Sequence, residues 1–447
     1  MTDLSLYKSV HFIGIGGVSM SSLAHIMLNN GAKVSGSDRT ESETTKRLAA
    51  AGAEIYIGQS AENIKNPELV VYTAAISKDN PELVRAREKG IETVERADFL
   101  GKLMELYDYP VSVSGTHGKT TTTSMLSCVF LKAALDPTVL VGGEFAQIGG
   151  NYHIGSKKHM IFEGCEYVDS FLKFKPKAAV ILNIEADHLD YFSGIDQIKA
   201  SFNKFMKLVP PSGFVVINAD DKNVMDSLDG VLCEKITFGK NGRYHAENVI
   251  YDEKGCGKFD VYRGGEKAGE ITLSVPGAHN VSNALAVFAC AEKFGIDEKT
   301  IEEGISEFGG AKRRFEYKGS LNGARIFDDY AHHPTEVKAT LETAKKVTKG
   351  EIWCVFQPHT YSRTKALLND FAAALETAHH PIITEIYAAR EKNTIGISGK
   401  DLADKIKNAV YIAEFKDIAD YLKKNVREGD TVLTVGAGTI TQLSELL

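Results

Sequence analysis

Residues 110–124 read PVSVSGTHGKTTTTS, and this stretch decides the fold, because a short apolar run meets a glycine-rich loop and a series of threonines. The apolar run 110–114 has the composition of a buried strand, and a helix is expected from the threonines to about Lys132. A strand, a glycine-rich turn and a helix start in this order direct several backbone N–H groups at an anion. The stretch therefore predicts a phosphate-binding loop.

The individual residues of this loop point to a nucleotide. Lys119 supplies a positive charge for β- and γ-phosphates, and the Thr120 hydroxyl is placed to bind Mg²⁺. The pattern G-x-x-x-x-G-K-[ST] requires a glycine at position 113, where this chain has Val113. A plain strand–helix turn would also use a glycine pair, but strand, loop, G-K-T and helix together favour phosphate binding. Whether the nucleotide is hydrolysed, only held, or used to drive another bond stays open at this point.

Length and composition indicate a globular protein of several domains. The chain has 447 residues, of which 43% are hydrophobic and 25% charged, and its net charge is −7. Such a charge argues against a nucleic-acid partner. The six cysteines are scattered without a CxxC pair, which favours reduced thiols over zinc or disulfides. No run reaches the ~18 apolar residues of a membrane span, and MTDLSLYKSVHF lacks a secretory pattern, so we expect a cytoplasmic monomer or homodimer without membrane contact.

Strand and helix signals alternate along the chain and restart twice, which predicts three α/β domains at residues 1–107, 108–312 and 313–447. The first is expected to be Rossmann-like, with parallel strands at 9–15, 33–37, 54–57 and 68–72 and helices at 19–30 and 81–89. The second, of the phosphate-loop type, has expected strands at 110–114, 160–162, 178–183 and 213–218, an antiparallel insertion at 244–274 and a helix at 282–294. The last, again Rossmann-like, has expected strands at 324–328, 351–356, 381–384 and 431–435 and helices at 336–347 and 364–376.

A second glycine-rich loop, GIGGVS at residues 14–19, follows the first expected strand. It has the form G-x-G-x-x-S, with Ser19 where a dinucleotide-binding loop has glycine or alanine. Asp38 falls about where a Rossmann unit places the acid that binds a ribose. NAD, another diphosphate attached to a ribose, and a purely structural turn are all compatible with this pattern.

Acids and histidines follow two expected strands of the middle domain. Glu163 comes after the strand at 160–162, and the segment 183–188, NIEADH, comes after the next. Loops at the carboxyl ends of parallel strands meet in one crevice, where carboxylates and a neutral imidazole can hold one or two Mg²⁺ ions. Taken singly, Glu163 is more often a solvated acid and His188 a helix-cap partner. Their joint placement favours a functional site.

Three later segments carry clustered polar residues: GAHNVSN at 277–283, DDYAHHPT at 328–335 and QPHTYSR at 357–363. The first opens a helix, and Ser282 can cap that helix. In the second, Pro334 starts a helix, and zinc is not expected because adjacent histidines rarely ligate one metal and H-E-x-x-H is absent. In the third, Arg363 can bind a carboxylate or phosphate through two parallel hydrogen bonds.

These residues, in this order, resemble the Mur ligase family. The matching stretches run from residue 11 to residue 440: HFIGIGGVSM, GSD, SGTHGKTTT, NIEADHLD, PGAHNVSNALA, RRFE, DDYAHHPTE, FQPHTYSRT, YAAREK and VGAGTI. The resemblance implies ATP-driven amide formation between the carboxylate of UDP-N-acetylmuramate and L-alanine, through an acyl phosphate, in peptidoglycan precursor synthesis. It also implies that the first domain binds the UDP-sugar, the middle domain ATP and the last domain the amino acid.

The resemblance further implies roles for individual residues. The ATP site would comprise Gly115, Thr116, His117, Gly118, Lys119, Thr120, Thr121, His279, Asn280, Asn283 and Arg314. Mg²⁺ would be held by Thr120 and Glu163, and a second ion by His188. The UDP moiety would face Gly16, Gly17, Ser37, Asp38, Thr73, Ala74, Ala75 and Ile76. The amino-acid and acyl-phosphate site would contain Tyr330, His332 and Arg363, and the catalytic set would be Lys119, Glu163, His188, His332 and Arg363.

Three departures from the family pattern weaken parts of this transfer. Ser19 and Thr360 stand where relatives often have glycine and arginine, and the unusual stretch FEGCEYVDSF leaves the role of Glu166 open. No lysine is assigned as a carbamylated metal ligand. Three alternatives share some of these motifs: a ligase that attaches a tripeptide to the same UDP-sugar, a nucleotide switch or hydrolase, and an NAD-dependent dehydrogenase. A non-enzymatic binding protein fits least, because so many strand ends carry reactive side chains.

Overall fold

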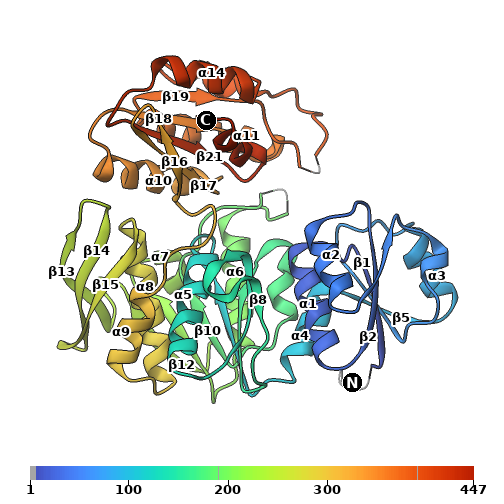
Figure 1. Cartoon of the computed structure of the whole chain (residues 1–447). Coiled ribbons are helices and arrows are strands. Elements are labelled where there is room, and N and C mark those ends of the chain that lie inside the picture. The colour runs from blue at the N-terminus through green and yellow to red at the C-terminus, as the bar shows by residue number, and fades with distance from the viewer. Residues whose placement is uncertain (1–6, 190, 390) are drawn as a thin grey trace.

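The computed structural model describes residues 7–189, 191–389 and 391–447. One position each of NIEADHLD (190) and YAAREK (390), and the first six residues of MTDLSLYKSVHF, therefore lie outside the described residues. The chain forms three α/β domains, each built on its own mainly parallel sheet, which confirms the expected fold class. Figure 1 shows the C-terminal domain above the central domain, with the N-terminal domain beside the central one. No helix in the described part of the chain is long and apolar enough to cross a membrane.

The N-terminal domain has five parallel strands in the order β3-β2-β1-β4-β5, which is the Rossmann-like arrangement. Its strands are β1 (Ser9–Ile13), β2 (Lys33–Asp38), β3 (Glu54–Ile57), β4 (Leu69–Tyr72) and β5 (Glu92–Glu95). Its helices are α1 (Val18–Asn29), α2 (Glu43–Ala50), the 3₁₀ turn η2 (Ala61–Asn63), α3 (Pro81–Glu88) and α4 (Arg96–Met104). The glycine-rich loop after β1 and the end of β2 lie at the same edge of the sheet, because these strands are parallel neighbours.

The central domain is built on ten strands in the order β15-β14-β13-β12-β11-β10-β6-β9-β7-β8. Its strands are β6 (Tyr109–Ser114), β7 (Thr138–Phe145), β8 (Gly150–His153), β9 (His159–Gly164), β10 (Ala178–Ile181), β11 (Phe214–Asn218), β12 (Glu234–Phe238), β13 (Tyr244–Tyr251), β14 (Cys256–Arg263) and β15 (Glu266–Pro276). Its helical segments are α5 (Lys119–Lys132), η3 (Ala146–Ile148), η4 (Tyr167–Lys173), α6 (Ile195–Lys207), α7 (Lys222–Asp226), α8 (His279–Lys293) and α9 (Glu298–Ser306). Strands β13 to β15 are the expected antiparallel insertion, and they extend the main sheet.

Strand β6 explains why the phosphate loop lacks its first glycine. It lies between β10 and β9, and Val113 is fully buried in it, paired with Val180 and Glu163. The strand therefore continues through the position at which a longer loop would begin. The same register corrects one expectation, since Glu163 is a residue of β9 and does not follow that strand.

Helix α8 also begins earlier than predicted. Its first residue is His279, so His279 and Asn280 occupy the first turn, and Ser282 lies inside the helix and does not cap it. Ala278 is the N-cap residue and makes no side-chain capping bond. The Asn280 and Val281 backbone N–H groups instead donate to the carbonyls of Gly277 and Ala278 (3.1 Å each), so the helix starts with a tight 3₁₀-type turn.

The C-terminal domain has six strands in the order β16-β17-β21-β18-β19-β20, all parallel except the β16–β17 pair. Its strands are β16 (Glu316–Leu321), β17 (Ala324–Asp329), β18 (Ile352–Phe356), β19 (His380–Ile383), β20 (Val410–Tyr411) and β21 (Thr431–Val435). Its helical segments are α10 (Pro334–Val347), α11 (Tyr361–Ala366), α12 (Leu368–Leu375), α13 (Gly399–Ala403), α14 (Phe415–Asn425) and η5 (Thr439–Glu445). The single helix expected at 364–376 is two helices, because Leu367 has φ −110° and ψ 21°, outside the helical region.

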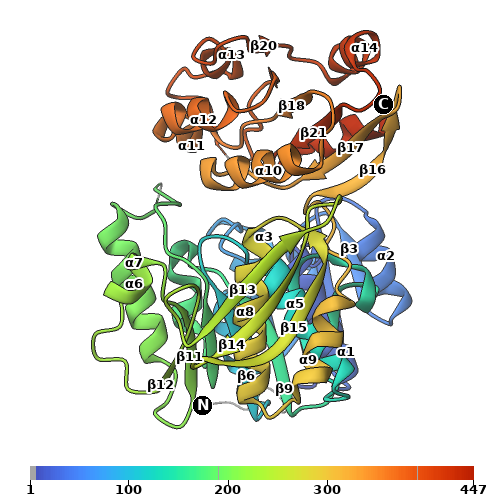
Figure 2. The same ribbon diagram turned by 90° about the vertical axis from the view of Figure 1, so that its left-hand side faces the viewer.

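The three domains are joined in different ways. One buried hydrophobic cluster runs from the N-terminal domain into the central domain, and includes both Phe12 and Phe162. The two clusters of the C-terminal domain contain only residues of that domain. Figure 2 shows β13–β15 rising toward the C-terminal domain, where the Lys346 ammonium lies 3.9 Å from the centre of the Tyr251 ring. The C-terminal domain thus meets the rest of the chain mainly through polar contacts.

Candidate active site

Residues 115–118 form the turn between β6 and α5, and a side chain from the next strand end fixes this turn. The Asn183 Oδ1 accepts a hydrogen bond from the His117 backbone N–H (2.8 Å), and its Nδ2 donates to the His117 carbonyl (3.1 Å). Gly118 has φ +84°, and a Cβ there would lie 3.1 Å from the Asn283 Oδ1. The loop is therefore held in one conformation at the helix start. NIEADH was noted in the sequence, but no role was assigned to Asn183.

Lys119 points back into this loop and is fully engaged. Its ammonium donates to the carbonyls of Gly115 (2.5 Å) and Thr116 (3.0 Å), and it forms a 3.0 Å ion pair with Glu166. Burial alone would lower the pKa of Lys119, but Glu166 and Cys165 raise it above its usual value, so the side chain is charged. Glu166 is only 2% exposed. The residue whose role was open in the sequence is thus the counter-ion of the phosphate-loop lysine.

A cavity of about 200 Å³ lies between the phosphate loop, the start of α8 and the C-terminal domain. It is lined by residues expected to bind ATP, namely His117, Gly118, Thr121, His279, Asn280, Asn283 and Arg314. Burial and the nearby Arg314 lower the pKa of His279 to about 4, so this ring is neutral. The other expected ATP residues, Gly115, Thr116, Lys119 and Thr120, belong to the same loop and helix start but do not line the cavity.

Two acids of the C-terminal domain also line this cavity, and the sequence analysis did not assign them. Asp329 ends β17, and burial raises its pKa to about 6. Glu336 lies in the first turn of α10. Both belong to the DDYAHHPTE stretch. The sequence features that could have identified them are an acid at a strand end and an acid three residues after the helix N-cap.

The three residues expected to hold Mg²⁺ fall into two places. Glu163 accepts a hydrogen bond from the Gly142 backbone N–H (2.5 Å), and a Cβ on Gly142 would lie 3.1 Å from its carboxylate. A Cβ on Gly143 would lie 3.4 Å from the Thr120 methyl group. Thr120 and Glu163 therefore both lie against the glycine pair at 142–143 of strand β7, where neither residue carries a side chain beside the carboxylate. His188 instead packs on Tyr167, with ring centres 4.6 Å apart, at a second cavity.

The second cavity, of about 400 Å³, lies between the central and C-terminal domains and is lined by His188, His359, Thr360 and Arg363 among others. Residues with positive φ gather at or beside it: Val168, Asp169, His188, Thr360 and Ala389. A β-branched residue such as Thr360 (φ +64°) rarely adopts this conformation. Strained backbone of this kind concentrates at functional sites, which supports a binding role for the cavity.

The residues expected to bind the amino acid are brought together through His359. The ring of His332 lies 5.4 Å from that of Tyr330 and 5.8 Å from that of His359, measured between centres. The His359 Nδ1 is 3.2 Å from the Arg363 guanidinium. Burial lowers the pKa of His332, and burial with His332 lowers that of His359 to about 4. His359 was part of a noted stretch but had no assigned role.

Arg363 already holds a carboxylate. Its Nε (3.2 Å) and Nη2 (3.0 Å) both donate to one oxygen of Asp187, across the boundary between the two domains. Burial would raise the pKa of Asp187, but Arg363 keeps it well below its usual value. In the structure, the carboxylate partner of Arg363 is therefore a side chain of the central domain.

The UDP loop is shaped by contacts within the N-terminal domain. The Gly16 backbone N–H donates to Asp38 (2.9 Å), and a Cβ on Gly16 would lie 2.8 Å from the same oxygen. Ser37 is fully buried, and its hydroxyl donates to Glu82 (2.6 Å). Its side chain is therefore turned away from any ligand, while its carbonyl accepts from Gly14 and Ile15. The turn 73–76 follows β4 at the same edge, and Gly17 precedes α1.

Glu82 provides a test of how this loop is supported. It is fully buried, accepts hydrogen bonds from Ser37 and Asn63, and lies 3.5 Å from the His11 ring. Burial would raise the pKa of Glu82, but His11 and these hydrogen bonds keep it below the usual 4.5. A depressed carboxyl pKa stabilises the folded state above the unfolded pKa, and this stabilisation is lost as the pH falls further.

We expect Glu82→Gln to destabilise the N-terminal domain by about 2 kcal/mol at pH 7, because charge-assisted hydrogen bonds are weakened. Below about pH 4.5 the difference between variant and wild type should shrink. Hydrogen exchange of the β1 and β4 amides measures both effects. Glu88→Gln, on the exposed end of the same helix, is the control. A constant difference across this pH range would contradict the assignment.

The three α/β domains, with a lysine-bearing phosphate loop in the central one, define a nucleotide-dependent enzyme assembled across domains. Three models of one family match consecutive parts of the chain. "Mur ligase family, catalytic domain" matches residues 9–108, "Mur ligase middle domain" residues 113–291, and "Mur ligase, glutamate ligase domain" residues 313–438.

Related proteins match over nearly the whole length. The UDP-N-acetylmuramate–L-alanine ligase of Acetivibrio thermocellus is 51% identical over 99% of this chain and 96% of its own, and that of Clostridium perfringens is 50% identical over 98% and 97%. The crystal structure of UDP-N-acetylmuramate–alanine ligase from Thermotoga maritima matches with a TM-score of 0.82 and 33% identity over 98% and 97% of the two chains. The chain belongs to the Mur ligase family, whose members are ATP-dependent, amide-forming enzymes of peptidoglycan synthesis.

Proposed function

We propose that this enzyme joins L-alanine to the carboxylate of UDP-N-acetylmuramate while ATP is cleaved to ADP and phosphate. The observation that carries the proposal is the pairing of Arg363 with a carboxylate at the second cavity, next to the domain that bears the phosphate loop. The names of the full-length relatives support the same two substrates. On this proposal, residues 1–107 bind the UDP-sugar, 108–312 bind ATP and 313–447 bind the amino acid.

The first chemical step is transfer of the γ-phosphoryl group to the sugar carboxylate. A carboxylate oxygen attacks the γ-phosphorus, the bond to the β-phosphate oxygen breaks, and ADP leaves with that electron pair. The charge of Lys119 is balanced by Glu166 in the structure, and a phosphate can take over part of that balance. Lys119 and the backbone N–H groups at the start of α5 stabilise the charge that develops on the transferring oxygens.

In the second step, the amine of L-alanine attacks the acyl phosphate, and inorganic phosphate leaves. The amine must lose a proton, and a neutral imidazole can accept it. His332 and His359 are both neutral at pH 7, because burial lowers the pKa of each. The His332 Nδ1 lies 3.0 Å from the Tyr330 carbonyl and donates its hydrogen there, so its Nε2 carries the free lone pair. We therefore assign proton acceptance to the Nε2 of His332.

Glu163 and Thr120 flank the glycine pair at 142–143 in β7, and their carboxylate and hydroxyl groups would hold a Mg²⁺ ion. When bound, Mg²⁺ would neutralise charge between the β- and γ-phosphates. His188, which lines the second cavity, would bind the second Mg²⁺ ion. Water must be kept from the acyl phosphate, and closure of the C-terminal domain over the central domain serves this purpose.

We place the enzyme in the cytoplasm, because ATP is a cytoplasmic nucleotide and all six cysteines are free thiols. We expect the enzyme to be a monomer or a homodimer.

The rival with the same motifs attaches a tripeptide to the UDP-sugar. A murein peptide ligase from Psychrobacter arcticus matches this chain with a TM-score of 0.73 and 26% identity, lower on both measures than the ligase from T. maritima. Acceptor use distinguishes the two functions. We expect phosphate release from ATP to require both UDP-N-acetylmuramate and L-alanine. Release only with the tripeptide would support the rival, and release that needs neither acceptor nor UDP-sugar would mean a nucleotide hydrolase.

A further inference from the structure

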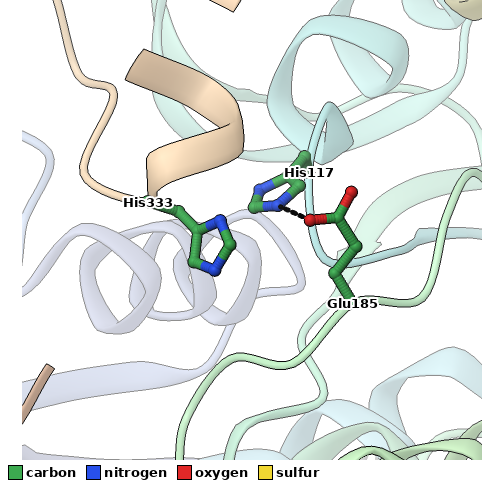
Figure 3. Close-up of side chains that lie close together, drawn as sticks. All are labelled: His117, Glu185 and His333. Atoms are coloured by element: carbon green, nitrogen blue, oxygen red, sulfur yellow. Dashed lines mark ion pairs between the residues drawn. The ribbon is translucent and has the colours of Figure 1, made fainter. Parts of the chain in front are cut away.

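His117, Glu185 and His333 lie together where the phosphate loop meets the start of α10 (Figure 3). One ring nitrogen of each histidine and one carboxylate oxygen of Glu185 all lie within 4.8 Å of one another. Among the described residues, this is the group of three histidine, cysteine or acidic side chains that is close enough to share an ion. Two of its members come from the central domain and one from the C-terminal domain. Neither Thr120 nor Glu163 belongs to it.

The surroundings of His117 prepare one of its nitrogens as a ligand. Its Nδ1 lies 3.1 Å from the Glu336 carboxylate, whose other oxygen accepts from the His332 backbone N–H (2.9 Å). A carboxylate that binds one ring N–H fixes the tautomer and leaves the other nitrogen for a metal. That other nitrogen, the His117 Nε2, is buried and makes no hydrogen bond with any described residue. It lies 3.4 Å from the Glu185 carboxylate. Although burial would lower the pKa of His117, Glu336 and Glu185 raise it to about 9, so a metal ion has to displace the proton from this nitrogen.

The other two ligands are also held in place. The Thr335 hydroxyl donates to Glu185 (2.7 Å), and the His333 Nε2 lies 3.2 Å from the Ala186 carbonyl. His333 is buried, and its Nδ1 accepts from the Thr335 backbone N–H as the N-cap of α10. These contacts limit the motion of the side chains without filling the space between them. They are the outer contacts that orient metal ligands in proteins.

We propose that His117, Glu185 and His333 bind one divalent transition-metal ion of the zinc class, and that this ion ties the C-terminal domain to the central domain. Two imidazoles and one carboxylate, with a fourth position left for water, form a common zinc ligand set. The ion takes the lone pair of the His117 Nε2, any proton there passes to solvent, and the Nδ1 keeps its hydrogen toward Glu336. His333 exchanges one of its present contacts for the ion. The bond across the domains then holds them in the arrangement seen here.

Equilibrium dialysis of the full-length protein against Zn²⁺, without nucleotide, tests the binding. We expect one tightly bound ion per chain, and at least about a tenfold loss of affinity in His333→Asn and in Glu185→Gln. Asparagine still caps a helix, so His333→Asn leaves the start of α10 intact. His380→Asn is the matched control, because His380 pairs with Glu351 (2.6 Å) on the surface of the C-terminal domain. Equal Zn²⁺ binding by wild type and both site variants would overturn the proposal.

Two further measurements distinguish metal binding at this site from metal binding elsewhere on the chain. Co²⁺ bound at His117, Glu185 and His333 should give visible ligand-field bands without thiolate charge-transfer absorption, whereas thiolate absorption would overturn the assignment. Small-angle scattering tests the tie between domains. Zn²⁺ should narrow the distribution of interdomain distances in the wild type and leave that of His333→Asn unchanged. An identical response of the two proteins would overturn the bridging role.

Discussion

Lys119→Met should lower turnover by at least about 10³-fold while UDP-N-acetylmuramate binding stays near that of the wild type. The lysine supplies the charge that the phosphate loop offers to the γ-phosphoryl group, and electrostatic stabilisation of this kind is usually the largest catalytic contribution. The UDP-sugar is proposed to bind in another domain, so its affinity does not depend on this side chain. Coupled phosphate-release kinetics measure the first quantity, and calorimetric titration with the UDP-sugar measures the second.

The structure also indicates a second reason for lost turnover in Lys119→Met, which is a loss of stability. Lys119 is the ion-pair partner of the buried Glu166, so its removal leaves an uncompensated carboxylate, at a cost of about 3 kcal/mol or more. The double variant Lys119→Met with Glu166→Gln removes that charge and should recover stability without recovering turnover. Lys132→Met, at the far end of the same helix, has surface partners and should behave like the wild type. Turnover in the stable double variant within tenfold of the wild type would contradict the phosphate-loop assignment.

Arg363→Lys should reduce kcat/KM for L-alanine by about 100-fold and leave ATP binding unchanged. Two nitrogens of the guanidinium, Nε and Nη2, donate to one carboxylate oxygen of Asp187, and a lysine cannot reproduce this forked geometry. Losing one charge-assisted hydrogen bond costs about 1.5–3 kcal/mol, which corresponds to about 10- to 100-fold. Steady-state kinetics with each substrate varied in turn measure the effect.

Controls for this second prediction come from the same domain. Arg427→Lys alters an exposed arginine whose guanidinium bonds only backbone carbonyls, among the partners described, and it should leave the kinetics unchanged. Thermal unfolding of Arg363→Lys should stay close to that of the wild type, since lysine still neutralises Asp187. A rise in the KM for ATP, with the KM for L-alanine unchanged, would move Arg363 from the amino-acid site to the nucleotide site.

The sequence predicted the parts of this fold that depend on local patterns. Alternating strand and helix signals were sufficient for three α/β domains, and most strand positions agree with the structure to within a few residues. The ends of elements were less predictable, because they depend on partners far along the chain. Glu163 lies inside β9 since that strand pairs with β6 to its last residues. Helix α8 starts at His279 without a capping side chain, so no sequence signal marked its true beginning.

In the candidate site, too, local sequence patterns were predictable and contacts between distant segments were not. The glycine-rich loop and Lys119 were visible because they form a continuous pattern. The ion pairs of Lys119 with Glu166 and of Arg363 with Asp187 join segments that lie 47 and 176 residues apart, and no local rule predicts such pairs. Ser37 was expected to face the UDP-sugar, yet its hydroxyl binds the buried Glu82. A strand residue points to one face or the other according to register, which the sequence did not reveal.

The central claim is that ATP activates the carboxylate of UDP-N-acetylmuramate for attack by L-alanine, and an isotope experiment tests it most directly. UDP-N-acetylmuramate labelled with ¹⁸O in that carboxylate is incubated with ATP, L-alanine and the enzyme, and the phosphate formed is analysed by mass spectrometry. The account predicts one ¹⁸O atom in each phosphate released, together with the alanyl product, because the carboxylate oxygen leaves on the phosphoryl group. Phosphate without ¹⁸O, whose fourth oxygen comes from water, would contradict it and would mean that the nucleotide is simply hydrolysed.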